Sequence, residues 1–221
     1  KEGLRLQQLG LNQGAVDAYK IAISFKRDFV DAYYNMGIAY GSLEEIGVDV
    51  LDHVLGSLKQ TIRLNADFIH GYIALGAAYI RKEEYEKALD VLNRAVTIDS
   101  KDSNAHYYIG VAYRAMKDFE RAATSLRSSA LLKPDALQTQ YFLGLVLLDC
   151  EKFQGACDAF SETVRIKPDF SEGHYMLGYI CLEKLFDEEK GVHHLSKAEK
   201  LYVKLEDFDR LERVRIMLKK L

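Results

Sequence analysis

Apolar and polar positions alternate along this chain in the steps of three and four residues that are typical of amphipathic α-helices. The pattern returns after a fixed interval. Residues 69–102 match residues 103–136 position by position without a gap, which gives a period of 34 residues. Large apolar positions coincide in this match, as where Leu92 falls on Leu126. Each period therefore predicts two short helices joined by a turn.

A glycine recurs within the first predicted helix of each period. The six positions are Gly3, Gly37, Gly76, Gly110, Gly144 and Gly178. Their spacing is 34 residues, except for 39 residues between the second and the third. A glycine inside a helix costs about 1 kcal/mol relative to alanine, so its recurrence needs a packing reason. The second helix offers a small residue followed four positions later by a large one, as at Ala88 and Leu92. We predict that the glycines let the two helices of each period approach closely.

This pattern resembles the tetratricopeptide repeat (TPR), a helix–turn–helix unit of this period with small and aromatic residues at fixed offsets. The resemblance implies an all-α fold, a right-handed α-solenoid of about six repeats with a C-terminal capping helix. The array is expected over residues 1–205, with repeats at about 1–29 (incomplete), 30–68, 69–102, 103–136, 137–170 and 171–205. The segment 206–221 continues an apolar stripe and is expected to form the capping helix, with Glu206 or Asp207 interrupting the stripe.

The second repeat contains five additional residues, which fall within 41–53 between its two helices. Helical spacing continues from Val50 to Ile62, so the hairpin is expected to be longer, with Asp49 as a candidate N-cap. Two interpretations stay open, a longer helix pair without a partner and a projecting contact point. The sixth repeat fits the pattern only with one extra residue in its turn.

The composition suits a continuous core, since 48% of the residues are hydrophobic and 29% are charged. A net charge of −3 argues against a dedicated nucleic-acid role, which normally needs a strongly basic face. Cys150, Cys157 and Cys181 form no CxxC pair and are odd in number, so neither a disulfide framework nor a zinc site is predicted, and buried free thiols are expected.

No apolar run reaches the roughly 18 residues that a membrane span needs. Because Gly3 takes the slot of Gly76, the opening residues of the first helix are missing, and upstream sequence is expected. We expect a cytoplasmic location. Association with a membrane through a partner or through a missing N-terminal segment stays open.

Candidate catalytic chemistry is sparse along the chain. His106 and His174 take an aromatic slot of the repeat and are interpreted as packing residues. His193 and His194 are adjacent on a predicted helix and point about 100° apart, which disfavours joint metal binding. No GxSxG, HExxH or Gly-rich phosphate loop occurs. We predict that the protein is not an enzyme and uses no cofactor or metal.

A second stripe of side chains lies on the first helices, roughly 100° from the packing stripe. In the TPR family these helices line a concave groove, so the resemblance implies a partner-binding surface there. The expected residues are Tyr34, Asn35, Ile38, Ile73, Arg81, Tyr107, Tyr108, Val111, Arg114, Tyr141, Phe142, Leu145, Tyr175, Met176 and Tyr179. Tyrosine offers a large contact area with few rotors and a hydroxyl group, which suits peptide binding.

Two alternatives to this surface stay open. The tyrosines would equally serve to seal the junctions between successive repeats. Arg81 and Arg114 would meet a carboxylate or phosphate together, or be solvated separately. The function that we expect is a non-enzymatic adaptor that binds a protein or peptide partner in its groove and aids complex assembly. The alternative is a structural subunit, including a homo-oligomer, that docks through its end helices and its lengthened second hairpin.

Overall fold

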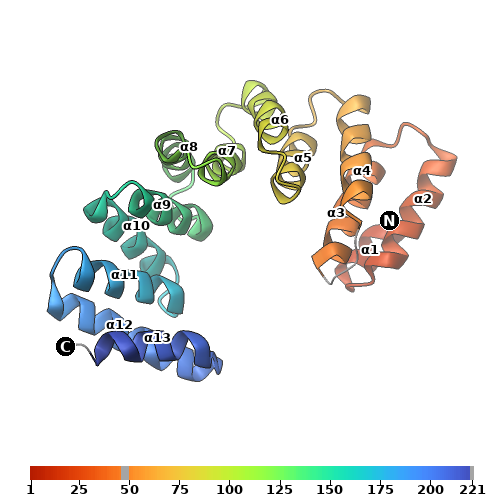
Figure 1. Ribbon diagram of the computed structural model, residues 1–221. Coiled ribbons are helices and arrows are strands. Elements are labelled where there is room, and N and C mark those ends of the chain that lie inside the picture. The colour runs from red at the N-terminus through yellow and green to blue at the C-terminus, as the bar shows by residue number, and fades with distance from the viewer. Residues whose placement is uncertain (46–49, 220–221) are drawn as a thin grey trace. The chain divides into compact units, whose positions relative to one another are not determined.

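The computed structural model describes residues 1–45 and 50–219, which form thirteen α-helices and no β-strand (Figure 1). Each helix packs mainly against its neighbours in the sequence, as in a helical-repeat solenoid. The predicted all-α class is therefore confirmed. The chain divides into two compact units, Lys1–Met116 and Lys117–Leu221.

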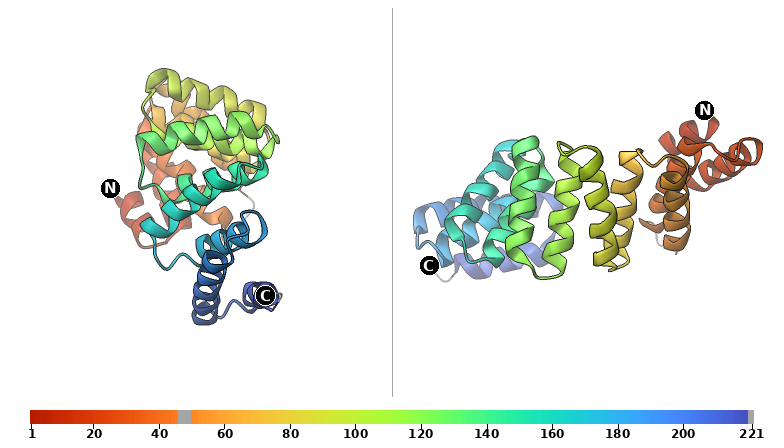
Figure 2. Two further views of the ribbon diagram at one scale, coloured as in Figure 1. Left: turned by 90° about the vertical axis from the view of Figure 1, so that its left-hand side faces the viewer. Right: turned by 90° about the horizontal axis from the view of Figure 1, so that it is seen from above.

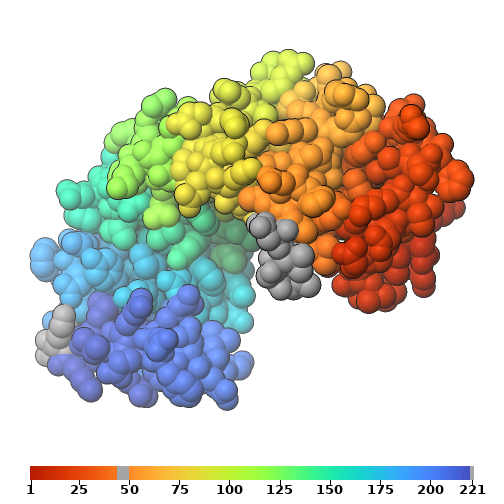
Figure 3. Space-filling view, turned by 45° about the vertical axis from the view of Figure 1, so that its right-hand side comes forward, coloured from red at the N-terminus to blue at the C-terminus, as the bar shows by residue number. Residues whose placement is uncertain are grey.

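The first unit contains seven helices. They are α1 (Glu2–Gln8), α2 (Asn12–Phe25), α3 (Val30–Glu45), α4 (Leu51–Leu64), α5 (Ile69–Arg81), α6 (Tyr85–Ile98) and α7 (Ser103–Ala115). Consecutive helices pack together throughout, and α5 also contacts α7. Figure 2 shows α5 and α6 side by side, and the space-filling view shows the orange and yellow helices in continuous contact (Figure 3).

The second unit contains six helices. They are α8 (Phe119–Leu132), α9 (Leu137–Asp149), α10 (Phe153–Ile166), α11 (Ser171–Glu183), α12 (Glu188–Leu205) and α13 (Phe208–Leu218). Packing again runs from each helix to the next. The helices at Ile69, Ser103, Leu137 and Ser171 begin at intervals of 34 residues across the two units, whereas 39 residues separate Val30 from Ile69.

Close approach explains the glycines of the first helices. A Cβ added at Gly76 would lie 2.5 Å from Cγ of Leu92, and one added at Gly144 would lie 2.7 Å from Cζ of Phe160. Both large side chains are fully buried. Since ordinary carbon contacts are about 3.5–4.0 Å, any larger residue would push the two helices apart.

The turns between paired helices share a backbone conformation. Gly10, Glu83, Lys117 and Glu151 have positive φ, with values of 74°, 60°, 62° and 57°. In the sixth repeat this conformation moves one residue along, to Phe186 with φ of 56°, as the expected extra residue requires. A residue in the left-handed backbone conformation follows the first helix and turns the chain sharply into the second helix.

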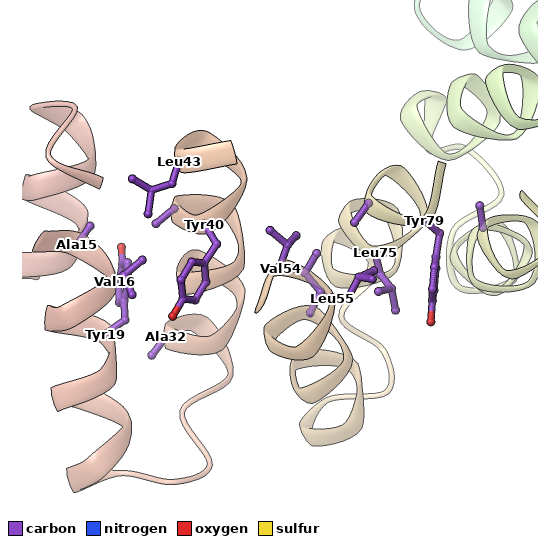
Figure 4. Packing of buried hydrophobic residues seen from close by; sticks show 14 of the residues in the cluster. Ala15, Val16, Tyr19, Ala32, Tyr40, Leu43, Val54, Leu55, Leu75 and Tyr79 are labelled. Carbon is purple, nitrogen blue, oxygen red and sulfur yellow. The ribbon is translucent and has the colours of Figure 1, made fainter. Parts of the chain in front are cut away.

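Apolar side chains fill the interior of the first unit. Figure 4 shows Val16 and Tyr19 of α2 facing Tyr40 of α3, and all three are at most 6% exposed. The core cluster continues through α4 to Leu75 and Tyr79 of α5. Helix α4 begins after Val50, and the expected cap Asp49 lies outside the described residues.

The last helix covers the end of the second unit. Helix α12 ends before Glu206, which has a left-handed conformation, and the side chain of Asp207 caps α13 by accepting a hydrogen bond from the backbone N–H of Arg210 at 3.1 Å. Leu211, Val214 and Met217 of α13 then join a buried cluster with α12. Within the described part of the chain, no helix is both long and apolar enough to cross a membrane.

Candidate functional site

A cavity of about 530 Å³ lies in the first unit between α3 and α5. Its small lining residues are Gly37, Gly41, Ala74, Ala77 and Ala78. Val54 and Leu58 of α4, both almost fully buried, close its base. The cavity exists because residues without bulky side chains occupy the facing sides of the two first helices.

Larger side chains form the walls of this cavity. Tyr34 and Ile38 project from α3, and Tyr108 projects from α7. The Tyr34 ring packs edge-on against Phe68, with ring centroids 5.2 Å apart. Burial raises the pKa of the Tyr34 hydroxyl, and the neighbouring Tyr108 adds to the rise. The Tyr34 hydroxyl therefore stays protonated at neutral pH and remains able to donate a hydrogen bond.

Polar groups complete the lining. Ser42, His70, Arg81 and Asn104 contribute hydrogen-bonding atoms, and Arg81 contributes a positive charge. Among the lining residues whose side chains the structure describes, there is no Asp or Glu.

Five of the expected partner-binding residues line this cavity, namely Tyr34, Ile38, Ile73, Arg81 and Tyr108. Ile73 is buried to 8% exposure, so it presents only a small part of its surface there. The Asn35 amide donates to the backbone carbonyl of Asp31 at 2.7 Å, and Asn35 does not line the cavity.

Three further expected residues lie on α7 outside the cavity. Tyr107 is half-buried, packs edge-on against Tyr108 at 5.1 Å, and has its pKa raised to about 12 by burial, with a smaller effect from Tyr108. Val111 and Arg114 are also half-buried. Arg81 lines this cavity, whereas Arg114 is not among its lining residues.

The other expected residues belong to the second unit, on α9 and α11. They are Tyr141, Phe142, Leu145, Tyr175, Met176 and Tyr179, and all are half-buried. Tyr141 packs edge-on against Phe160 and Phe170, with centroid distances of 5.7 and 5.4 Å. The tyrosines thus have one face in the packing and keep part of their surface in solvent.

Tyr175 lines a small cavity of about 20 Å³ with residues of α12 and α13. The buried Tyr202 hydroxyl donates to the Glu172 carboxylate at 2.8 Å, and Arg210 lies 3.5 Å from the same carboxylate. A space of this size holds about one water molecule. The cluster joins the capping helix to α11 and is too small for a side chain of a partner.

Sequence reasoning missed several polar and small residues that line the α3–α5 cavity. His70, Asn104 and Ser42 lie at its edge, and Gly41 and Ala77 leave it open. Two features of the sequence could have indicated this cavity, namely the 39-residue spacing of the second repeat and the small residues on both flanking helices.

A histidine pair in the second unit was also missed. The Nδ1 atoms of His174 and His194 are 3.0 Å apart, and Nε2 of His174 lies 3.1 Å from the Pro168 carbonyl oxygen. His174 therefore donates from Nε2 to the carbonyl, and its Nδ1 accepts from His194. Burial lowers the pKa of both rings, and that of His194 falls to about 4. No group of three or more potential metal ligands lies together in residues 1–45 and 50–219.

Consecutive helix pairs with close glycine contacts define a helical-repeat protein. Two sequence profiles agree, one described as a TPR repeat that matches residues 3–43 and 76–117, and one described as a tetratricopeptide repeat that matches residues 107–171. The chain belongs to the TPR family.

Solved structures with similar folds include other TPR proteins. YrrB, titled a TPR protein with an unusual peptide-binding site, is 19% identical with a TM-score of 0.68, over 93% of this chain and 100% of that one. TTC0263 from Thermus thermophilus is 18% identical with a TM-score of 0.66, over 81% of this chain and 95% of that one. MamA from Desulfovibrio magneticus RS-1 is 20% identical with a TM-score of 0.67, over 79% and 96%. A search of curated protein sequences finds no significant match.

Proposed function

We propose that this TPR protein is a non-enzymatic adaptor that binds a segment of a partner protein in the α3–α5 cavity. The observation that carries the proposal is a cavity of about 530 Å³ with small lining residues, an apolar base and walls of Tyr34, Ile38 and Tyr108. Apolar cavities with a few oriented polar groups are typical ligand sites. YrrB, whose structure is similar, is described as a TPR protein with an unusual peptide-binding site.

The lining indicates which chemistry the partner segment offers. Gly41 and Ala77 allow a bulky apolar side chain to reach the buried base, where it would displace water from Val54 and Leu58. The tyrosine hydroxyls offer donors for backbone carbonyl groups. Arg81 lies at the same cavity, where its guanidinium group offers hydrogen-bond donors to the partner segment.

Filling the cavity tests this proposal. Among the described atoms, the nearest neighbour of a Cβ at Gly41 would be Nη1 of Arg81 at 3.7 Å, so Gly41→Leu fits the backbone and places its side chain at the cavity. We would select peptides on the wild-type chain from a randomised library and measure their affinities by fluorescence anisotropy. Selected peptides should share an apolar anchor, and Gly41→Leu should weaken their binding at least about tenfold, equivalent to about 1.4 kcal/mol.

Gly56 provides the matched control. A Cβ there meets nothing within 4 Å, and the residue is exposed on α4 outside the cavity, so Gly56→Leu makes the same chemical change elsewhere on the same unit. Circular dichroism should show that both variants keep wild-type helicity. Equal peptide affinity for wild-type and Gly41→Leu protein would rule out the cavity as the binding site.

A second candidate function is docking through the C-terminal end. Leu205, Phe208 and Ile216 of α12 and α13 are 62%, 70% and 48% exposed, which is high for apolar side chains. Phe208→Ser together with Ile216→Ser removes two of these three apolar side chains while leaving the buried face of α13 in place. Light scattering should report a smaller particle for the double variant if this end joins subunits. Equal masses for both proteins would dismiss this candidate.

A further inference from the structure

Two of the three cysteines meet in the second unit. The Sγ atoms of Cys157 on α10 and Cys181 on α11 are 4.0 Å apart, although the residues are 24 positions apart in the sequence. Cys181 is 2% exposed and Cys157 is half-buried. Helices α10 and α11 pack directly against each other, so the contact belongs to the junction between the fifth and sixth repeats.

A covalent bond between these sulfur atoms requires only a small movement. A disulfide has an S–S distance of about 2.05 Å, so the two atoms must approach by about 2 Å. Rotation about the Cα–Cβ bonds can move a sulfur atom over such a distance. The third thiol differs, because Cys150 lies at the end of α9 and its Sγ makes no contact with either of the other two among the described interactions.

We infer that Cys157 and Cys181 form a thiol–disulfide site that reacts with small-molecule disulfides and links α10 to α11. Cys157, the more accessible thiol, attacks one sulfur of the reagent as its thiolate and forms a mixed disulfide, and one reagent thiol leaves. The Cys181 thiolate then attacks the Cys157 sulfur, and the second reagent thiol leaves. Two electrons pass to the reagent, and its two thiol products carry the two protons that the cysteines lose.

The environment sets the order and the rate of these steps. Burial raises the pKa of Cys181 to about 12, and the nearby Cys157 adds to this rise. At neutral pH Cys181 is therefore mostly a thiol, which slows its attack on the mixed disulfide. The mixed disulfide should accumulate first, and closure to the intramolecular disulfide should accelerate as the pH rises.

The test oxidises the full chain with glutathione disulfide and maps the product. Trypsin separates the three cysteines by cleaving after Lys152 and Arg165. Because Lys133 and Lys167 precede proline and resist cleavage, the relevant peptides are 128–152, 153–165 and 166–184. Mass spectrometry without reduction should find 153–165 linked to 166–184. Cys150→Ser should retain this link and Cys157→Ser should lose it.

Unfolded protein supplies the reference for native geometry. In a flexible chain the shorter loop between Cys150 and Cys157 closes more readily than the loop to Cys181, so oxidation in urea should favour the 128–152 to 153–165 link. Oxidation of the folded chain should reverse this preference. Dominance of the shorter link in folded protein, or the absence of any intramolecular link, would overturn the inference.

Thermal melting gives a second readout. Closing a loop of this length restricts the unfolded chain, so the melting temperature of oxidised wild type and oxidised Cys150→Ser should rise by roughly 5 °C or more. Oxidised Cys157→Ser should show no rise. This inference is independent of partner binding, because it involves neither the α3–α5 cavity nor the first unit.

Discussion

The contact between Gly76 and Leu92 allows a quantitative test of how the paired helices pack. In Gly76→Ala the new Cβ would lie 2.5 Å from Cγ, 2.6 Å from Cδ2 and 3.0 Å from Cδ1 of Leu92. Leu92 is 0% exposed, so its side chain has no solvent space into which it can withdraw. The two helices must separate by about 1 Å to restore ordinary carbon contacts of about 3.5 Å.

Two opposing effects set the expected magnitude. Overpacking a dense core costs about 1–3 kcal/mol, whereas replacing a helical glycine with alanine gains up to about 1 kcal/mol. Contacts of 2.5 to 3.0 Å place this site in the upper half of the overpacking range, so Gly76→Ala should lower the free energy of unfolding by about 1–2 kcal/mol. Gly41→Ala, where the new Cβ would have Arg81 Nη1 as its nearest neighbour at 3.7 Å, should instead raise it by about 0.5–1 kcal/mol.

Urea unfolding followed by helical circular dichroism measures both changes. Leu92→Ala alone should cost about 3–5 kcal/mol by opening a cavity. The double variant should lose at least about 1 kcal/mol less than the sum of the single losses, because the methyl group introduced at position 76 occupies part of that cavity. Equal or greater stability of Gly76→Ala, or strict additivity in the double variant, would refute the packing explanation.

Three further predictions concern buried polar groups and the turns. Because burial lowers the pKa of His174 and His194, the unfolded chain binds more protons between about pH 6.5 and the folded pKa of His194 of about 4. Stability should therefore fall as pH drops through this window, by about 1.4 kcal/mol for each unit of pKa difference, and urea midpoints of His194→Asn should depend less on pH. Glu151→Gly should raise the free energy of unfolding by about 0.5–1 kcal/mol, because Glu151 has φ of 57°, whereas Glu151→Ala should give no gain. Tyr202→Phe should lower the free energy of unfolding by about 1–2 kcal/mol through loss of the 2.8 Å hydrogen bond to Glu172, as chemical denaturation would show.

The sequence alone determined the repeating plan of the chain. Apolar spacing reports which face of a helix is buried, and that information is local, so the period of 34 residues, lengthened to 39 in the second repeat, specified the helix pairs. Recurrent glycines such as Gly76 and Gly144 indicated close helix approach, which the contacts with Leu92 and Phe160 now explain. The additional turn residue of the sixth repeat could also be counted, and it corresponds to the shift of positive φ to Phe186.

Only the tertiary structure decided which of the expected site residues meet. Arg81 lines the α3–α5 cavity and Arg114 does not. This difference depends on the distance between neighbouring first helices and on where small residues lie along them. The contact between Cys157 and Cys181 and the hydrogen bond between His174 and His194 likewise join residues from different helices. A periodic pattern records the face of each helix but carries no record of the neighbour opposite that face, so contacts between particular side chains arise only when the helices pack.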